Sequence, residues 1–383
     1  MIASMELVRE LAILQPGVPV LSLHVRTDPR EPANTAATPK WLVELRNGLR
    51  KVVDAADEKE SRSERLARRE LCAWAEREVL GLNPRDRARG LAWFISSDAA
   101  VNRRFTLQLP PRATLVRWDD RPFVSPLVDV VDRGRPTGLV LVSTEAIRLL
   151  LWQAGRVEQP EQSLYELEPG QWRDYDAYVG HPGRTSAGMH VATFEQRIDE
   201  WRQRFLAEAA IAIGEQVREF GWHHLLLAGD KQLIDGFADQ LPDPVRERVI
   251  DVVNANVLWE EPAAVADRFE SVLDEAWRRD AHKIVDGAIE GAFEGGRGAL
   301  GWAEVLDCLV QHRVEHLVFV ADATPNPENL PPHVRNALGE PSADMVVERA
   351  VEHAVGSGAD VTAVSDDFGR LLSVGGVVAT LRY

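Results

Sequence analysis

The sequence predicts an α/β protein with more than one sheet. Short apolar runs of strand length alternate with longer amphipathic stretches, a pattern typical of α/β folds with largely parallel strands. With 383 residues the chain has room for two or three domains. Hydrophobic residues make up 45% of the chain and charged residues 27%, which is ordinary globular composition and excludes a disordered chain.

The first segment, residues 1–135, predicts an N-terminal mixed α/β domain. An amphipathic helix is expected over residues 5–14, and Pro16-Gly17 ends it. A strand at Val18–Val25 and a polar loop over 26–39 lead to one long helical stretch, Trp41–Leu80, which is dense in charged i,i+4 partners. Further strands are expected at 91–96, 105–109 and 113–118.

The second segment, residues 136–264, follows a linker at Gly134-Arg-Pro136 and predicts a central α/β domain with a long loop. Strands are expected at 137–143, 147–152 and 224–228, and helices at 191–220 and 231–239. One further short element is expected at 242–253. Between the second strand and the first helix, residues 158–189 predict a long loop or an exposed hairpin, and a loop of that length inside a domain is either functional or evidence of a wrong assignment. Its part 178–190 combines glycines with Arg, His, Thr and Ser, so it is the first candidate for a site.

The third segment, residues 265–383, predicts a C-terminal α/β sandwich. Helices are expected at 265–291, 302–312 and 344–356, and strands at 316–321, 360–364 and 371–382. A Gly-rich turn at 295–298 resembles a phosphate loop only in composition, because no strand precedes it and no Lys-Ser/Thr follows it.

Charge is divided unevenly along the chain. The total is −16, which argues against a protein that coats nucleic acid, because neutralising phosphates needs clustered Lys and Arg. Residues 1–135, however, carry a net charge of +4, and residues 136–270 and 271–383 carry −11 and −9. This asymmetry predicts different partners for the two ends of the chain, although charges that merely solvate the surface would give a similar division.

Known catalytic and targeting signatures are missing from the sequence. Cys72 and Cys308 are the two cysteines, too few for a disulfide framework or a zinc knuckle, so we expect neither a metal nor a cofactor. The chain shows no Rossmann, P-loop, zincin or nucleophile-elbow pattern. No signal peptide and no apolar run of roughly 18 residues is present, which predicts a cytoplasmic protein without a membrane partner.

Several short stretches in a fixed order resemble the archaeo-eukaryotic class-1 release factor and Pelota superfamily, in particular its bacterial branch, which includes Balon-type hibernation factors. The stretches are Val20–Val25, Gly138–Val142 with Ile147–Trp152, Gly183–Gly188 with Phe194–Phe205, Leu225–Gly229, Val305–Leu309 with Val314–Val320, and Val374–Tyr383. Each is weak alone, but six in the family's order are specific. The resemblance implies a three-domain release-factor-like architecture and a tRNA mimic that binds rRNA in the ribosomal A site, with no DNA partner.

Two departures from the family's pattern bear on activity. The catalytic Gly-Gly-Gln tripeptide is not retained, because the corresponding loop reads Gly183-Arg184-Thr185-Ser186-Ala187-Gly188 and contains no glutamine. The N-terminal segment has no Asn-Ile-Lys-Ser stretch of the kind that reads stop codons. The leading hypothesis is therefore a non-hydrolytic factor of ribosome hibernation or rescue that does not read stop codons. Two alternatives stay open: a peptidyl-tRNA hydrolase with a divergent loop, and an acidic stress or interaction protein that acts away from the ribosome.

Candidate contact residues follow from these hypotheses. The acidic C-terminal segment would contact a protein such as a translational GTPase, and the N-terminal segment would approach the decoding centre. The central loop, residues 178–190, would probe the peptidyl-transferase centre. The RNA-binding candidates are basic side chains on the long helix, near the strands and in the central loop: Arg62, Arg65, Arg68, Arg69, Arg103, Arg104, Arg112, His181, Arg184 and His190.

Overall fold

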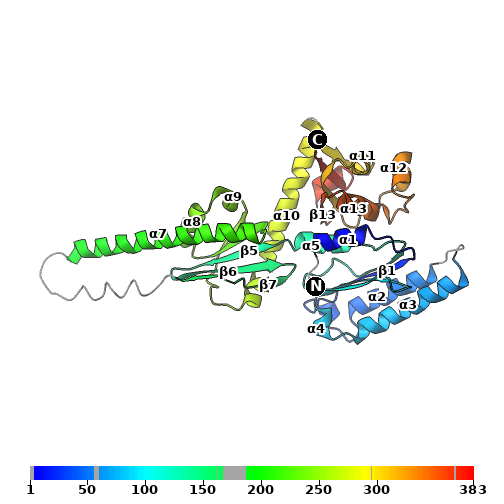
Figure 1. Cartoon of the computed structure of the whole chain (residues 1–383), viewed down its shortest axis with the longest axis horizontal. Helices are drawn as coiled ribbons and strands as arrows, with labels where there is room; N and C mark the ends of the chain where they lie inside the picture. The colour runs from blue at the N-terminus through cyan, green and yellow to red at the C-terminus, as the bar shows by residue number, and fades with distance from the viewer. Residues whose placement is uncertain (1–3, 56–59, 162, 167–186, 295, 366–367) are drawn as a thin grey trace. The chain divides into compact units, whose positions relative to one another are not determined.

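The computed structural model describes residues 4–55, 60–161, 163–166, 187–294, 296–365 and 368–383 (Figure 1). It contains three separate sheets, one within each of the three predicted segments, so the predicted α/β class is confirmed. The expectation of largely parallel strands is wrong, because the sheet of the first segment is antiparallel and the other two sheets combine parallel with antiparallel pairs. The chain divides into two compact units, unit 1 with Met1–Gly134 and Trp277–Tyr383, and unit 2 with Arg135–Ala276. The division of the chain into three domains at 135 and 264 stays a prediction.

The N-terminal sheet of unit 1 is antiparallel and has the order β3-β2-β1-β4. Its strands are β1 (Val20–Val25), β2 (Gly90–Ser96), β3 (Asn102–Leu107) and β4 (Leu115–Asp119). All residues of β1 and β2 are buried, because helices cover both faces of the sheet. Helices α2 (Lys40–Asp54) and α3 (Arg62–Gly81) cover one face, and α1 (Met5–Ala12) and α5 (Ser125–Arg133) lie against the other.

The prediction of one long helix over 41–80 is wrong. Helix α2 ends at Asp54, and Ala55 takes an extended conformation with ψ 109°. Helix α3 then begins after Ser61, whose side chain accepts a hydrogen bond from the Glu64 backbone N–H, while the Glu64 side chain accepts one from the Ser61 N–H. This reciprocal capping satisfies backbone donors that an uninterrupted helix would have paired internally.

The C-terminal sheet of unit 1 has the order β11-β14-β12-β13. Its strands are β11 (Gly298–Leu300), β12 (Val314–Val320), β13 (Asp360–Val364) and β14 (Val377–Leu381). Strands β12 and β13 are parallel, and the chain between them forms α13 (Val346–Gly356). The neighbouring helices are α10 (Pro262–Glu294), α11 (Gly301–Val310), α12 (Pro332–Ala337) and α14 (Gly369–Ser373).

The predicted closing strand over 371–382 is partly wrong. Its first residues belong to α14, and the strand itself starts only at Val377. Gly375 and Gly376 separate the two with φ values of 93° and 78°, a backbone conformation that residues with a side chain rarely adopt.

One hydrophobic core joins the two chain segments of unit 1. It contains apolar residues of β1, β2 and β3, of α1 and α5, and of α11, α13 and the C-terminal sheet. Helix α5 contacts β13, and α1 contacts α13. The N-terminal and C-terminal sheets are therefore two layers of one packed body.

Unit 2 is built on a mixed sheet of order β10-β9-β5-β6-β7, with β8 also paired to β6. The strands are β5 (Thr137–Val142), β6 (Ala146–Gln153), β7 (Arg156–Glu158), β8 (Leu164–Glu166), β9 (His224–Gly229) and β10 (Val249–Asn254). Helices α7 (Ala187–Glu219) and α8 (Lys231–Gln240) cover one face, and the first part of α10 covers the other. Short helical turns complete the two units: η1 (Pro32–Asn34), α4 (Pro84–Arg87), α9 (Asp243–Arg246) and η2 (Pro327–Asn329).

Two glycines of the central sheet are required by close packing. A Cβ at Gly138 would lie 2.4 Å from Cε3 of the fully buried Trp222. Gly229, the last residue of β9, has a φ of 152°, and a Cβ there would lie 2.1 Å from the carbonyl oxygen of Val142. The glycine of the sequence Leu225–Gly229 is therefore fixed by the packing of β9 against β5.

Candidate nucleic-acid interface

The central loop lies almost entirely outside the described residues. His181 and Gly183, Arg184, Thr185 and Ser186 are in the part that the structure does not describe. Ala187 and Gly188 are the first helical positions of α7, and His190 is in its first turn. The structure therefore describes the support of the loop and leaves the roles of its side chains as predictions.

Helix α7 is the support of this loop. Leu206, Ala210, Ile213 and Val217 are buried at helical spacing against the central sheet. The N-terminal turns of α7 extend beyond β5 and β6 (Figure 1). A helix of 33 residues is about 50 Å long, so α7 is longer than the part of it that packs on the sheet.

The arginines of α3 divide into exposed and buried positions. Arg62, Arg65 and Arg69 are exposed on one flank of the helix, at spacings of three and four residues. Arg68 is buried, forms an ion pair with Glu60 at 2.8 Å and donates to the Ala55 carbonyl oxygen at 2.8 Å. Arg68 therefore holds the start of α3 to the end of α2, and the other three remain candidates for RNA contact.

A second group of arginines lies at the edge strand β3 and beside it. Arg103 and Arg104 are exposed on β3, and the Arg104 guanidinium lies over the Trp93 ring at 5.7 Å. Helix α4 contacts β3, and its Arg87 lies over the Trp41 ring at 5.0 Å. We call Arg85, Arg87, Arg103 and Arg104 the edge arginines. Stacking on tryptophan fixes the plane of a guanidinium while leaving its N–H groups free to bind phosphate or a base.

The two groups of arginines lie on different sides of α3. Trp74 of α3 packs against Trp93 with ring centroids 5.1 Å apart, on the side where Arg104 lies. Glu76, seven residues after Arg69 and so on the same flank, forms an ion pair with Arg46 of α2 at 2.7 Å. Because Trp74 and Arg69 are five residues apart, they point to nearly opposite sides of the helix. The exposed arginines of the N-terminal segment discussed above thus lie in two separate basic regions.

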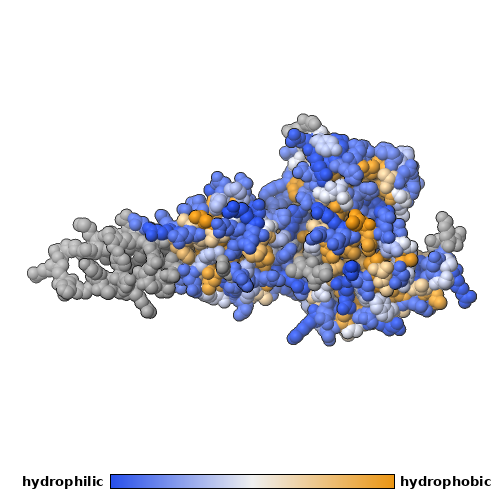
Figure 2. Space-filling model, in the orientation of Figure 1, coloured by the Kyte–Doolittle hydropathy of each residue, from blue (hydrophilic) through white to orange (hydrophobic). Residues whose placement is uncertain are grey.

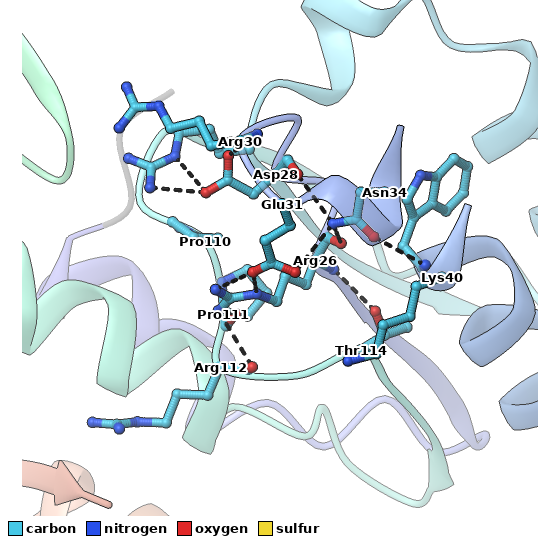
Figure 3. A network of polar contacts seen from close by, with 12 residues as sticks. Arg26, Asp28, Arg30, Glu31, Asn34, Lys40, Pro110, Pro111, Arg112 and Thr114 are labelled. Atoms are coloured by element: carbon cyan, nitrogen blue, oxygen red, sulfur yellow. Dashed lines mark hydrogen bonds and ion pairs between the residues drawn. The ribbon is translucent and has the colours of Figure 1, made fainter. Parts of the chain in front are cut away.

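Arg112 is half-buried and connects two parts of unit 1. Its guanidinium donates to Asp129 at 2.9 Å and to the Ala363 carbonyl oxygen of β13 at 2.8 Å. Its own carbonyl oxygen accepts from Arg26, which also pairs with Glu31 in the loop after β1 (Figure 3). Arg112 therefore has a structural role in joining the loop that precedes β4 to the C-terminal sheet.

The loop after β1 is fixed by polar contacts on both sides (Figure 3). Buried Asp28 pairs with Arg89 at 2.9 Å, and buried Asn34 donates to the carbonyl oxygens of Arg26 and Asp28. The Asn34 side-chain oxygen accepts from the Trp41 N–H at 3.3 Å, next to the ring that carries Arg87. This network holds Trp41, the residue whose ring carries Arg87, in place.

The sequence prediction missed Arg85 and Arg87. They belong to the run Pro84-Arg-Asp-Arg87, which forms a single helical turn after α3. The available signal was the local density of arginine close to the predicted strand at 91–96. The burial of Arg68 was also missed, although Arg68 lies four residues before Cys72 and seven before Ala75, both of which are buried on α3.

Candidate metal sites and membrane-spanning helices are absent from the described residues. These residues contain no cluster of three or more His, Cys, Asp or Glu side chains that would hold a metal ion. Among them, none of the helices is long and apolar enough to cross a bilayer. Hydrophilic residues dominate the visible face of the molecule, with apolar residues in small patches (Figure 2).

Residues 122–288 match the sequence model of bacterial archaeo-eukaryotic release factor family 10. The predicted resemblance to this superfamily is confirmed. The matched segment contains the whole of unit 2 of this release-factor-like protein, including α7 and the central sheet. No curated protein sequence matches the chain.

Solved structures of an archaeal termination factor and of Pelota-type proteins resemble the chain at low identity. An archaeal translation termination factor, aRF1, is 18% identical with a TM-score of 0.24, and the match covers 99% of this chain and 98% of that one. Archaeal Pelota, in a model bound to the ribosome with ABCE1, is 13% identical with a TM-score of 0.42 and covers 100% and 95%. Dom34 of S. cerevisiae, described as interacting with Hbs1, is 9% identical with a TM-score of 0.42 and covers 77% and 79%. Likeness at this level carries no conclusion about function.

Proposed function

We propose that this release-factor-like protein is a ribosome-binding translation factor that occupies the A site as a tRNA mimic and acts in ribosome hibernation or rescue. The match of residues 122–288 to the release-factor family is the observation that carries the proposal. On this proposal the factor does not read stop codons, because the N-terminal segment has no Asn-Ile-Lys-Ser stretch.

The edge arginines are the proposed RNA-facing groups of the N-terminal sheet. They lie in the one segment of the chain with a positive net charge, +4 over residues 1–135. Cations that are held by stacking lose little conformational entropy on binding, so they suit contacts with phosphates or unstacked bases. Arg62, Arg65 and Arg69 form a second proposed contact on the flank of α3.

The proposed task of the central loop is to enter the peptidyl-transferase centre without hydrolysing the ester. Helix α7 supplies the reach, and residues 183–188 contain no glutamine to position a water molecule. The acidic C-terminal part, with −9 over residues 271–383, is proposed to contact a protein such as a translational GTPase.

Co-sedimentation with ribosomes at several salt concentrations tests the proposal. The test variant is the triple substitution Arg85→Gln, Arg87→Gln and Arg104→Gln. Its matched control removes three exposed, ion-paired arginines from other parts of the chain: Arg246→Gln, Arg268→Gln and Arg370→Gln. We expect the test variant to bind more weakly and to lower the slope of log affinity against log salt by up to about three, one for each lost phosphate contact.

Two outcomes would count against the proposal. If the wild-type protein stays in the supernatant, including with ribosomes from starved cells, the protein acts away from the ribosome. If it pellets and also releases peptide from stalled complexes, with release lost on deleting residues 183–188, the hydrolase hypothesis replaces the non-hydrolytic one. Equal effects of the two triple variants would remove the edge arginines from the interface.

A further inference from the structure

Unit 1 contains a cavity of about 200 Å³ at the carboxyl ends of the parallel strands β12 and β13. Phe319 and Ala321 at the end of β12 and Ala363 of β13 form one wall. The opposite wall comes from the N-terminal segment, from β4 and the start of α5. In α/β sheets the crevice outside the carboxyl ends of parallel strands is the usual place for a ligand.

The two arginines of the cavity wall are in different states. Arg112 is already engaged, because its Nε donates to Asp129 and its Nη2 donates to the Ala363 carbonyl oxygen, and Arg133 adds a second ion pair to Asp129 at 2.8 Å. Arg117 has only a loose ion pair, with Nη1 3.7 Å from Asp344, which is beyond hydrogen-bond distance. Its Nε is shielded from solvent and has no hydrogen-bond partner among the described residues. Arg117 is therefore the cation of this wall that still lacks an acceptor.

The remaining residues that line the cavity are mainly apolar and would contact the uncharged part of a ligand. Leu115, Phe123, Phe319 and Val347 are the larger apolar side chains around the cavity. The Phe123 ring lies under the Arg117 guanidinium at 5.5 Å, so the charged and apolar parts of the site are adjacent. A small anionic group on a compact apolar body would satisfy both parts at once.

Asp344 is in the position of an internal competitor for such a ligand. Its side chain is 54% exposed at the start of the segment that leads into α13, and it accepts a hydrogen bond from Ser342 at 2.7 Å. The Asp344 carboxylate can turn away from Arg117 at little cost in free energy, because an exposed ion pair of this kind contributes only about 0–1 kcal/mol.

We propose that this cavity is a binding site for a small organic anion, a carboxylate or a phosphate monoester with a ring-sized apolar body, anchored by Arg117. Because the anchor and the apolar walls come from both chain segments of unit 1, a bound anion stabilises their packing. The proposal does not depend on the protein's acting on the ribosome.

Isothermal titration calorimetry of the full chain with benzoate and with phenyl phosphate tests the site. We expect saturable one-to-one binding in the millimolar to micromolar range, and the tighter of the two probes identifies the acidic group. Arg117→Gln should weaken binding by roughly tenfold or more, because a hydrogen bond between charged groups is lost. Asp344→Asn should tighten binding, because it removes the competitor, and it thereby guards against a variant that merely fails to fold.

Two further variants locate the binding. Ala321→Leu fills the cavity without changing its charge and should abolish binding, whereas Arg246→Gln, an exposed arginine of unit 2, should leave it unchanged. The proposal is overturned if neither probe binds saturably to the wild-type chain. It is also overturned if Arg117→Gln and Ala321→Leu bind as well as the wild type, since the anion would then be bound elsewhere.

Discussion

Glu348 of α13 is the most informative single position for testing the packing of unit 1. Its carboxylate is 1% exposed and accepts hydrogen bonds from the backbone N–H groups of Val124, at 2.5 Å, and Ser125, at 3.0 Å, where α5 begins. The preceding residue, Phe123, is held from β1 by Ser22 and His24. Burial lowers the pKa of His24 to about 4, so His24 acts as a neutral donor. Residues 123–125 are thus clamped between β1 and α13.

Burial raises the pKa of Glu348 from 4.5 to about 7, and the nearby Glu352 carboxylate adds to the rise, while the two N–H donors oppose it. Between these pH values the folded protein keeps the proton that the unfolded chain has lost. The free energy of unfolding therefore falls as the pH rises through this window, and it levels off above the folded pKa. At 1.36 kcal/mol per pKa unit the fall is roughly 3 kcal/mol.

Glu348→Gln removes this titration while keeping the size of the side chain. We would measure urea unfolding of both proteins by tryptophan fluorescence from pH 4.5 to above pH 7. The unfolding free energy of the wild type minus that of the variant should fall by roughly 3 kcal/mol across the window. Asp119, whose pKa burial raises to about 6, titrates in both proteins, so the subtraction largely removes it.

The control is Glu328→Gln, which removes an exposed carboxylate and should give a difference that is flat with pH. A flat difference for Glu348→Gln as well would refute the reasoning. It would mean that the Glu348 carboxyl is solvated in solution and that α13 does not clamp the start of α5.

Two further predictions concern backbone geometry and a buried charge. Gly229→Ala should lower the melting temperature strongly and lower the free energy of unfolding by several kcal/mol, because the new methyl group collides with the Val142 carbonyl oxygen. Gly287→Ala, in open space on α10, should leave the free energy of unfolding unchanged or raise it by up to about 1 kcal/mol. Arg68→Met should cost roughly 3 kcal/mol in urea unfolding because it leaves a buried carboxylate unpaired, and Arg69→Met, one residue along, should change stability by less than about 0.5 kcal/mol. A stable Gly229→Ala protein, or equal effects of the two arginine variants, would contradict the packing described.

Some strands were predictable because they are buried on both faces and read as continuous apolar runs, whereas the short strands β7, β8 and β11 were not predicted. Val20–Val25 and His224–Gly229 are examples, and in both the structure buries nearly every residue. The break between α2 and α3 was not predicted, because residues 55–60 contain neither glycine nor proline and continue the charged helical pattern. The usable signal was the capping box of Ser61 and Glu64, which marks a helix start inside an apparently continuous helix.

Helix α5 was not predicted, because its local sequence does not favour a helix. Its sequence, Ser125–Arg133, is short and rich in valine, which favours strands. The structure explains the composition, since most of its residues are buried between the two layers of unit 1. Tertiary packing that joins residues 1–134 to 277–383 has no local signature in the sequence, so the shared core had to come from the structure.

The ion pairs of the structure change the interpretation of the positive net charge of the N-terminal segment. A net charge of +4 over residues 1–135 invites the view that its arginines face RNA generally. Several of them instead neutralise buried carboxylates, as Arg89 does for Asp28 and as Arg112 and Arg133 do for Asp129. These cations stabilise the loop after β1 and the contact with the C-terminal sheet, so we expect their removal to destabilise the fold. The proposed RNA interface is therefore assigned to the edge arginines and to the exposed flank of α3, and not to the N-terminal arginines in general.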